Sequence, residues 1–137
     1  MPIRDCRFIG HRPAFNIRII NPDTGVFFDT EGIVDTGADS CAIPASFAPI
    51  LRHNLEKGDP TTVTTGNNDT RAFCHKTVIE LKNGKKETVY TISRKIHFVE
   101  GLHVVLLGVH EFLGNHCLYI DYPAGKFSIT SDTLQGP

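Results

Sequence analysis

The stretch that decides the fold is Ile33-Val34-Asp35-Thr36-Gly37-Ala38-Asp39-Ser40. Two branched apolar residues predict a buried strand, and this strand runs straight into a turn that a glycine opens. Asp35 is therefore presented by a rigid element at the start of a turn. A second Asp-Thr-Gly, at residues 23–25, follows Asn21-Pro22 instead of an apolar pair, so we interpret it as a plain hairpin turn.

Length and composition predict one globular domain. The chain has 137 residues, 40% hydrophobic and 21% charged, and we expect a single domain over residues 1–137, with its core at about 13–130 and a polar tail at 131–137. A net charge of −1 gives no reason to expect nucleic acid as a partner. We find no signal-peptide pattern and no apolar run near the ~18 residues of a membrane span, so no membrane association is expected. The four cysteines form no C-x-x-C pair, which favours reduced thiols and a cytoplasmic location.

Short strands and turns dominate the rest of the sequence. Alternating apolar residues predict strands at 15–19, 90–98, 118–120 and 127–129, and Asn83-Gly84 predicts a tight hairpin. The apolar run from Val104 to Leu107, followed by Gly108, predicts a strand that is buried on both faces. Residues 109–113 are predicted to form a short helix that Gly114 ends. The sequence therefore predicts a mainly β domain.

The order of these motifs resembles the retropepsin-like aspartic peptidases, which include the retroviral proteases and their single-domain cellular and bacterial relatives. Asp-Thr-Gly-Ala-Asp after two apolar residues, a glycine-bearing hairpin near residue 66, and the stretch 106–113 followed by Tyr119-Ile120-Asp121 carry the resemblance. It spans about residues 17–129 and is similar to the cellular and bacterial branch in particular. The resemblance implies a closed acid-protease barrel with one short C-terminal helix.

The resemblance also implies a role for each matching residue. The implied catalytic residues are Asp35, Thr36 and Gly37, and the implied substrate-binding residues are Ala38, Asp39, Gly66 and Asn67. By this resemblance Asp35 would be the catalytic acid, Thr36 would hydrogen-bond across a two-fold axis, and Gly37 would allow close approach of backbone and substrate. Asp39 would bind the substrate main chain, residues 65–70 would form a flap, and Gly108 would lie against the catalytic turn.

An aspartic endopeptidase needs two such carboxylates, and this chain has one. The two Asp-Thr-Gly copies are too close in sequence to belong to separate lobes, so we expect a homodimer that acts on a polypeptide substrate without a cofactor. Two Asp35 carboxyls at ~3 Å share one proton and activate a water. Ala38 has no hydroxyl to stabilise the charged pair, which favours activity near mildly acidic or neutral pH.

Two departures from the retroviral pattern leave an alternative open. Val109 stands where retroviral enzymes usually carry an arginine that pairs with the second aspartate of the motif, here Asp39. The flap segment has a single glycine, Gly66, beside two asparagines. These differences also fit a peptide-binding module on the same fold that does not cut its ligand.

The histidines and cysteines give little support for a zinc site or for a cysteine nucleophile. The spacing of Cys74-His75, His110 and His116-Cys117 does not match that of structural zinc sites, so no metal is expected. Cys41, shortly after the turn, is interpreted as an apolar position and not as a nucleophile, because no activating partner can be assigned.

Overall fold

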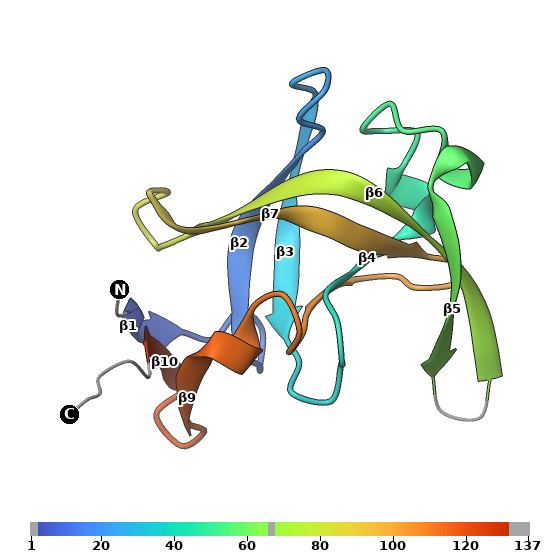
Figure 1. Ribbon diagram of the computed structural model, residues 1–137. Helices are drawn as coiled ribbons and strands as arrows, with labels where there is room; N and C mark the ends of the chain where they lie inside the picture. The colour runs from blue at the N-terminus through green and yellow to red at the C-terminus, as the bar shows by residue number, and fades with distance from the viewer. Residues whose placement is uncertain (1–2, 66–67, 132–137) are drawn as a thin grey trace.

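The architecture is mainly β. The computed structural model describes residues 3–65 and 68–131 (Figure 1), and no helix within those ranges reaches seven residues. The strands are β1 (Ile3–Arg7), β2 (Ala14–Ile20), β3 (Phe27–Val34), β4 (Ala42–Pro44), β5 (Asp59–Thr65), β6 (Asn68–Lys82), β7 (Thr88–Val99), β8 (Val105–Leu107), β9 (His116–Asp121) and β10 (Lys126–Ser131). Single-turn 3-10 helices interrupt them at η1 (Ala45–Phe47), η2 (Leu55–Lys57) and η3 (Leu113–Asn115). None of the described helices is long and apolar enough to cross a membrane.

Most of the strands close into a barrel. The main sheet has seven strands in the order β2-β3-β8-β4-β7-β6-β5, and β2 also pairs with the end of β6, which closes a 6-strand mixed barrel. The long strand β6 makes both contacts, because its residues 68–74 pair with β5 and its residues 78–82 pair with β2. β5 and the first part of β6 therefore project from the barrel as a hairpin, at the lower right of Figure 1.

The short strand β8 lies between β3 and β4, which are consecutive in the chain, and pairs with both. It runs parallel to β3, with Leu107 opposite Val34, and antiparallel to β4, with Leu106 opposite Ala42. Leu107 is fully buried, as predicted from the apolar run. Residues 35–41 connect β3 to β4, which lie on the two sides of β8. This loop must therefore pass around the end of β8.

A small sheet, in the order β1-β10-β9, packs beside the barrel. The hairpin of β9 and β10 was predicted from the sequence, whereas β1 was not. Phe15 of β2 packs between the small sheet and the barrel. Its ring centroid lies 5.2 Å from that of Phe127 in β10 and 6.3 Å from that of Phe112. All three rings are buried, so the two sheets share one hydrophobic core.

The core begins earlier than predicted, and the last strand ends one residue later than the predicted core. Ile3 of β1 is 5% exposed and pairs with Ile129 of β10, so the core begins before residue 13. β10 continues through Ser131, the first residue of the predicted polar tail. The remainder of that tail, residues 132–137, lies outside the described residues.

The predicted C-terminal helix at residues 109–113 is wrong. The chain instead forms wide turns there, in which the Leu113 N–H donates to the Gly108 carbonyl (2.9 Å) and the Gly114 N–H to the Val109 carbonyl (2.7 Å), and the helical turn η3 follows. Three consecutive side chains, those of Glu111, Phe112 and Leu113, are buried. A short α-helix rotates each residue by about 100° and cannot turn all three inward, so burial overrides the helical pattern.

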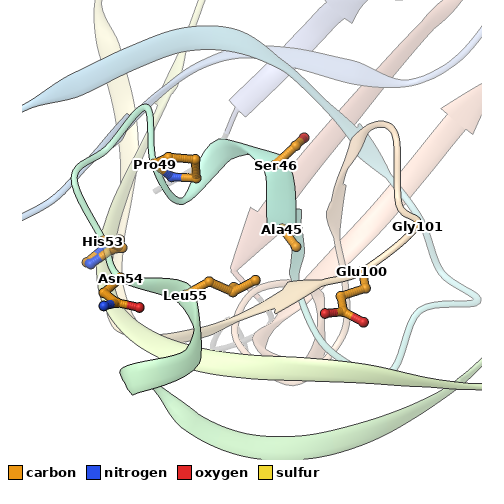
Figure 2. Close-up of a pocket in the computed structure, with 8 residues that line it drawn as sticks. All are labelled: Ala45, Ser46, Pro49, His53, Asn54, Leu55, Glu100 and Gly101. Carbon is orange, nitrogen blue, oxygen red and sulfur yellow. The ribbon is translucent and has the colours of Figure 1, made fainter.

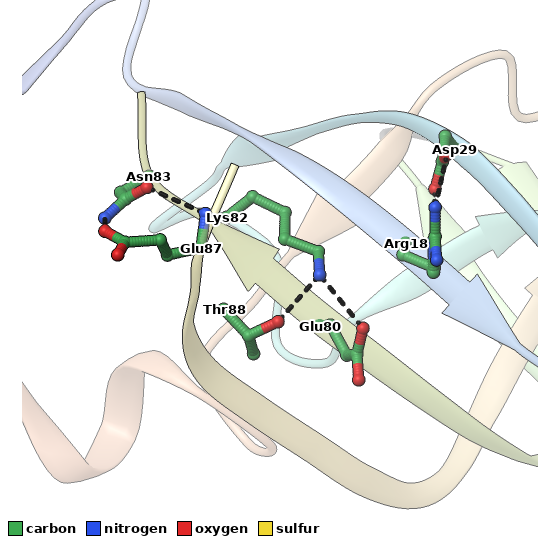
Figure 3. Close-up of polar contacts among 7 residues, drawn as sticks. All are labelled: Arg18, Asp29, Glu80, Lys82, Asn83, Glu87 and Thr88. Carbon is green, nitrogen blue, oxygen red and sulfur yellow. Dashed lines mark hydrogen bonds and ion pairs between the residues drawn. The ribbon is translucent and has the colours of Figure 1, made fainter. Parts of the chain in front are cut away.

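The hairpin at Asn83-Gly84 is confirmed, but its turn is longer than the two residues predicted. The Asn83 carbonyl accepts from the Lys86 N–H (3.0 Å), and the Asn83 side-chain oxygen accepts from the Lys85 N–H (2.9 Å). The same oxygen accepts from the Glu87 N–H at 3.0 Å (Figure 3). Lys86, not Gly84, takes the left-handed conformation, with φ of 64°. The adjoining strand ends are joined by Lys82, whose ammonium donates to Thr88 at 2.7 Å.

Candidate active site

Asp35 stands at the end of a strand that is fixed on both sides. The Val34 N–H donates to the Pro13 carbonyl (3.0 Å), and the Asp35 N–H donates to the Leu107 carbonyl of β8 (3.1 Å). Val34 is buried in the core, whereas Asp35 is half-buried. The barrel therefore sets the position of this carboxylate, and the turn leaves part of it accessible.

The turn folds back onto the Asp35 side chain. The Gly37 N–H donates to Asp35 Oδ1 at 2.9 Å, and the Ala38 N–H donates to the Asp35 carbonyl at 3.2 Å. An aspartate that binds the backbone two residues later is the usual Asx turn. A Cβ at Gly37 would lie 3.3 Å from the same carboxylate oxygen, so glycine permits this close return of the chain.

The segment after β8 is hydrogen-bonded to the backbone of the turn. The Val109 N–H donates to the Ala38 carbonyl (3.0 Å) and the His110 N–H to the Asp39 carbonyl (2.8 Å). A Cβ at Gly108 would lie 2.5 Å from the Ser40 carbonyl oxygen and 2.7 Å from that of Ala38. Gly108 therefore lies against the turn, as the resemblance implied.

A buried carboxylate that sequence reasoning missed holds the far end of the turn. Glu111 is 7% exposed, and its Oε1 accepts from the Cys41 N–H at 2.6 Å. Cys41 Sγ in turn accepts from the Gly108 N–H at 3.3 Å. The only sequence signal for this role is a glutamate directly before two apolar residues, and the helix predicted at 109–113 gave no reason to expect it to be buried.

Cys41 does not have the character of a nucleophile. Burial, the largest effect, and the nearby Glu111 raise the pKa of its thiol to about 12. A thiol with such a pKa is protonated near neutral pH, and only the thiolate is nucleophilic. All four cysteines of the chain are unpaired.

Removing the Glu111 side chain tests its structural role. Glu111→Ala leaves the buried Cys41 N–H without an acceptor, which costs about 1–3 kcal/mol, and we expect a loss of that size in the free energy of unfolding. Glu111→Gln keeps an oxygen that can accept and is expected to lose less. Urea denaturation of the three proteins measures the difference; equal stabilities of the parent and the alanine variant would contradict this role.

A cavity of about 590 Å³ opens over the turn. Four of the predicted residues line it, namely Asp35, Gly37, Ala38 and Asp39. The rest of the wall comes from elements remote in sequence and includes Thr62, Val63 and Thr64 of β5, His97 and Val99 of β7, and Leu106 of β8. Thr36 is exposed and is not among the lining residues, and Gly66 and Asn67 lie outside the described residues. The turn and the projecting hairpin thus form two sides of one cavity.

A second cavity, of about 530 Å³, lies between η1, η2 and the end of β7 (Figure 2). His53 and Leu55 line one side of it, and Glu100 and Gly101 line the other. In the part of the chain that the structure describes, no group of three or more histidine, cysteine or acidic side chains is arranged to hold a metal ion, here or elsewhere. His53 instead stacks on His75, with ring centroids 4.5 Å apart.

The environment of His53 should make the folded protein less stable in acid. Burial and, secondly, the neighbouring His75 lower the pKa of His53 below its ordinary value of about 6.5. The unfolded chain therefore binds a proton at a higher pH than the folded one, and stability falls as the pH drops from about 6.5 towards the lowered pKa. We expect the melting temperature to fall across this range, and to fall less in His53→Phe. The exposed His103→Gln is the control; a slope that His53→Phe leaves unchanged would contradict the assignment.

Two solved structures share this architecture. A retropepsin-like aspartic protease from Rickettsia conorii is 20% identical in sequence and matches with a TM-score of 0.64 over 93% of this chain and 98% of that chain. The chain has the retropepsin-like aspartic protease fold. EIAV protease, solved in complex with the inhibitor HBY-793, is 18% identical and matches with a TM-score of 0.50 over 77% of this chain and 91% of that chain. No family model and no curated protein matches the sequence, so among these comparisons only the solved structures support the retropepsin-like fold.

The retropepsin-like barrel of this chain differs from the implied retroviral pattern beside the turn. Val109 is 38% exposed. The carboxylate of Asp39 makes no ion pair within residues 3–65 and 68–131. Asp39 is exposed and lines the cavity, so its side chain is open to a ligand.

Proposed function

We propose that the protein is an aspartic endopeptidase whose active site is completed by a second copy of the chain. The observation that carries the proposal is the position of Asp35, which is half-buried and lines a cavity over a glycine turn in a retropepsin-like barrel. Each chain offers one such turn. The second copy of the motif, at residues 23–25, is exposed and does not line this cavity.

In the proposed dimer, two Asp35 carboxyls share one proton because both cannot be ionised at close range. The ionised carboxylate takes a proton from water as the water oxygen attacks the scissile carbonyl carbon. The protonated partner gives its proton to the carbonyl oxygen, and a tetrahedral gem-diol forms. Proton transfer to the amide nitrogen then breaks the C–N bond and releases an acid and an amine.

The wall opposite the turn suits an extended peptide. Within the described residues β5 pairs with β6 alone, so its outer backbone groups are open. Three successive residues of β5, Thr62 to Thr64, line the cavity. An extended peptide can add to such an edge as a further strand, with alternate side chains directed into the cavity. This arrangement supports a polypeptide as the substrate.

We assign the dimer contact to the edge strand β9. Its outer edge is unpaired in the described residues, and its side chains Tyr119 and Ile120 are 62% and 37% exposed. The strand contains no lysine or proline, which proteins commonly use to protect an exposed edge. Pairing of this edge with the same edge of a second chain would bring each of these side chains beside cross-strand neighbours of the partner.

Charges on this edge should separate the subunits. We expect the double variant Tyr119→Lys, Ile120→Lys to weaken dimerisation by about 100-fold or more, because like charges would face each other across the paired edges. Ile50→Lys is the control, because it charges an apolar position in the turn after η1 whose exposure of 47% lies between those of Tyr119 and Ile120. Sedimentation velocity measures the dimer, and peptide cleavage by mass spectrometry measures activity.

Activity should follow the dimer fraction, so the double variant cleaves only at concentrations where it still associates. If it stays dimeric and active, the contact lies elsewhere. A parent protein that cleaves no peptide between about pH 4 and 8 would remove the peptidase proposal.

A peptide-binding module without hydrolysis is the second candidate. Asp39 has no ion pair among the described residues, and Val109 is exposed where retroviral enzymes usually carry the arginine that pairs with this aspartate. Both observations favour the binding module. Binding of extended peptides by a monomer, with no product formed, would support the module over the peptidase.

A further inference from the structure

Among the described residues, His97 is the one imidazole that lines the cavity of Asp35. It lies in β7 between the buried residues Ile96 and Phe98, and alternation along a strand directs its side chain to the opposite face, that of the cavity. Its neighbour across the parallel pair with β4 is Ala42, whose small side chain also lines the cavity. The imidazole is therefore reached from the cavity and is only partly buried.

The two ring nitrogens of His97 are in different surroundings. Nδ1 is buried and has no hydrogen-bond partner, whereas Nε2 is not among the buried atoms without a partner. A buried N–H without an acceptor is rarer in proteins than an acceptor that lacks a donor. In a neutral imidazole one nitrogen carries the proton. For that form we assign the proton to Nε2, which makes Nε2–H a donor and leaves Nδ1 unprotonated.

The other lining residues determine which ligand group this donor suits. The charged residues of the cavity wall are Asp35 and Asp39, and their negative charge disfavours a ligand carboxylate. Apolar side chains line the same cavity, namely Val63, Val99, Leu102 and Leu106. The site thus offers an apolar surface for an aliphatic stem and one hydrogen-bond donor for a neutral acceptor at its end.

We propose that His97 is a specificity-determining residue that selects a glutamine or asparagine side chain of the substrate. The Nε2–H donates to the side-chain amide oxygen, while the methylene groups pack on the apolar wall. This inference rests on the proposed peptidase function. A pocket built to hydrogen-bond one group discriminates against ligands that lack it, because its polar atom is then left unpaired.

A position-scanned peptide library tests the selection. At one substrate position we expect glutamine or asparagine to exceed leucine and glutamate in kcat/KM by on the order of 10–100-fold. In His97→Leu this ratio should fall to about one or below, with leucine peptides cleaved at least as well as by the parent protein. His103→Leu, at an exposed histidine outside the cavity, should keep the parent's preference.

The outcomes separate this inference from the proposed function. A parent protein with no amide preference at any position, or a His97→Leu variant that keeps the preference, overturns the role of His97 while the peptidase stands. If no peptide is cleaved, the peptidase proposal fails, and calorimetry with reduced-amide peptides carrying glutamine or leucine then decides on His97. Equal affinities of the parent protein for the two peptides would overturn the inference in that case.

Discussion

Asp35→Asn should abolish peptide hydrolysis, with a loss of at least about 10³-fold in kcat/KM, while the fold and the dimer persist. The amide is nearly the same size as the carboxylate and keeps an oxygen that can accept the Gly37 N–H, which now lies 2.9 Å from Asp35 Oδ1. It cannot take a proton from water or share one with its twin. The variant therefore separates chemistry from structure, and initial rates on a cleaved library peptide measure the effect.

The chain supplies its own control for this experiment. Asp23→Asn changes the same tripeptide in the other copy, where the aspartate is exposed and its N–H donates to the Asn21 side chain at 3.0 Å. We expect this variant to cleave as fast as the parent protein. Unimpaired cleavage by Asp35→Asn would end the proposed mechanism, and retained peptide binding by both variants without any cleavage by the parent would favour the binding module.

The sequence predicted most strands because one face of each is buried. Ile17 and Ile19 of β2, and Ile96 and Phe98 of β7, are buried, as their alternation indicated. β1 was missed because a single buried residue, Ile3, precedes polar ones, so the strand depends on its pairing with β10 and carries almost no pattern of its own. The local sequence pattern thus predicts strands that have an apolar face of their own. It does not predict a strand that forms only because it pairs with a neighbouring strand.

The candidate site was predictable as far as it is local. Asp35, Gly37, Ala38 and Asp39 are close in sequence, and the turn brings them to one cavity. His97 could not be placed there, because its position depends on the parallel pairing of β4 with β7, which no local pattern specifies. Glu111 was missed for a related reason, since its partner is the backbone of a residue in another loop.

Gly108→Ala is expected to have the largest effect on stability, with a loss of about 3 kcal/mol or more in the free energy of unfolding. The new Cβ would lie 2.5 and 2.6 Å from the carbonyl oxygen and carbon of Ser40, and 2.7 Å from the carbonyl oxygen of Ala38. These are backbone atoms, which cannot rotate aside as a side chain can. Gly108 does not have a positive φ, so the cost comes from this steric contact and not from the backbone conformation of alanine.

Relief of that contact requires β8 and the turn to move apart. The movement would lengthen the bonds from the Gly108 N–H to Cys41 Sγ (3.3 Å) and from the Val109 N–H to the Ala38 carbonyl (3.0 Å), so the turn that carries Asp35 would lose its support. Gly84→Ala is the matched control, because its Cβ would meet no atom within 4 Å, and it should change stability by less than about 0.5 kcal/mol. Urea denaturation compares the free energies of unfolding of the two variants. If Gly108→Ala is insoluble while Gly84→Ala is soluble, that outcome also supports the prediction. Equal stability of both variants would show that β8 does not pack against the turn through this glycine.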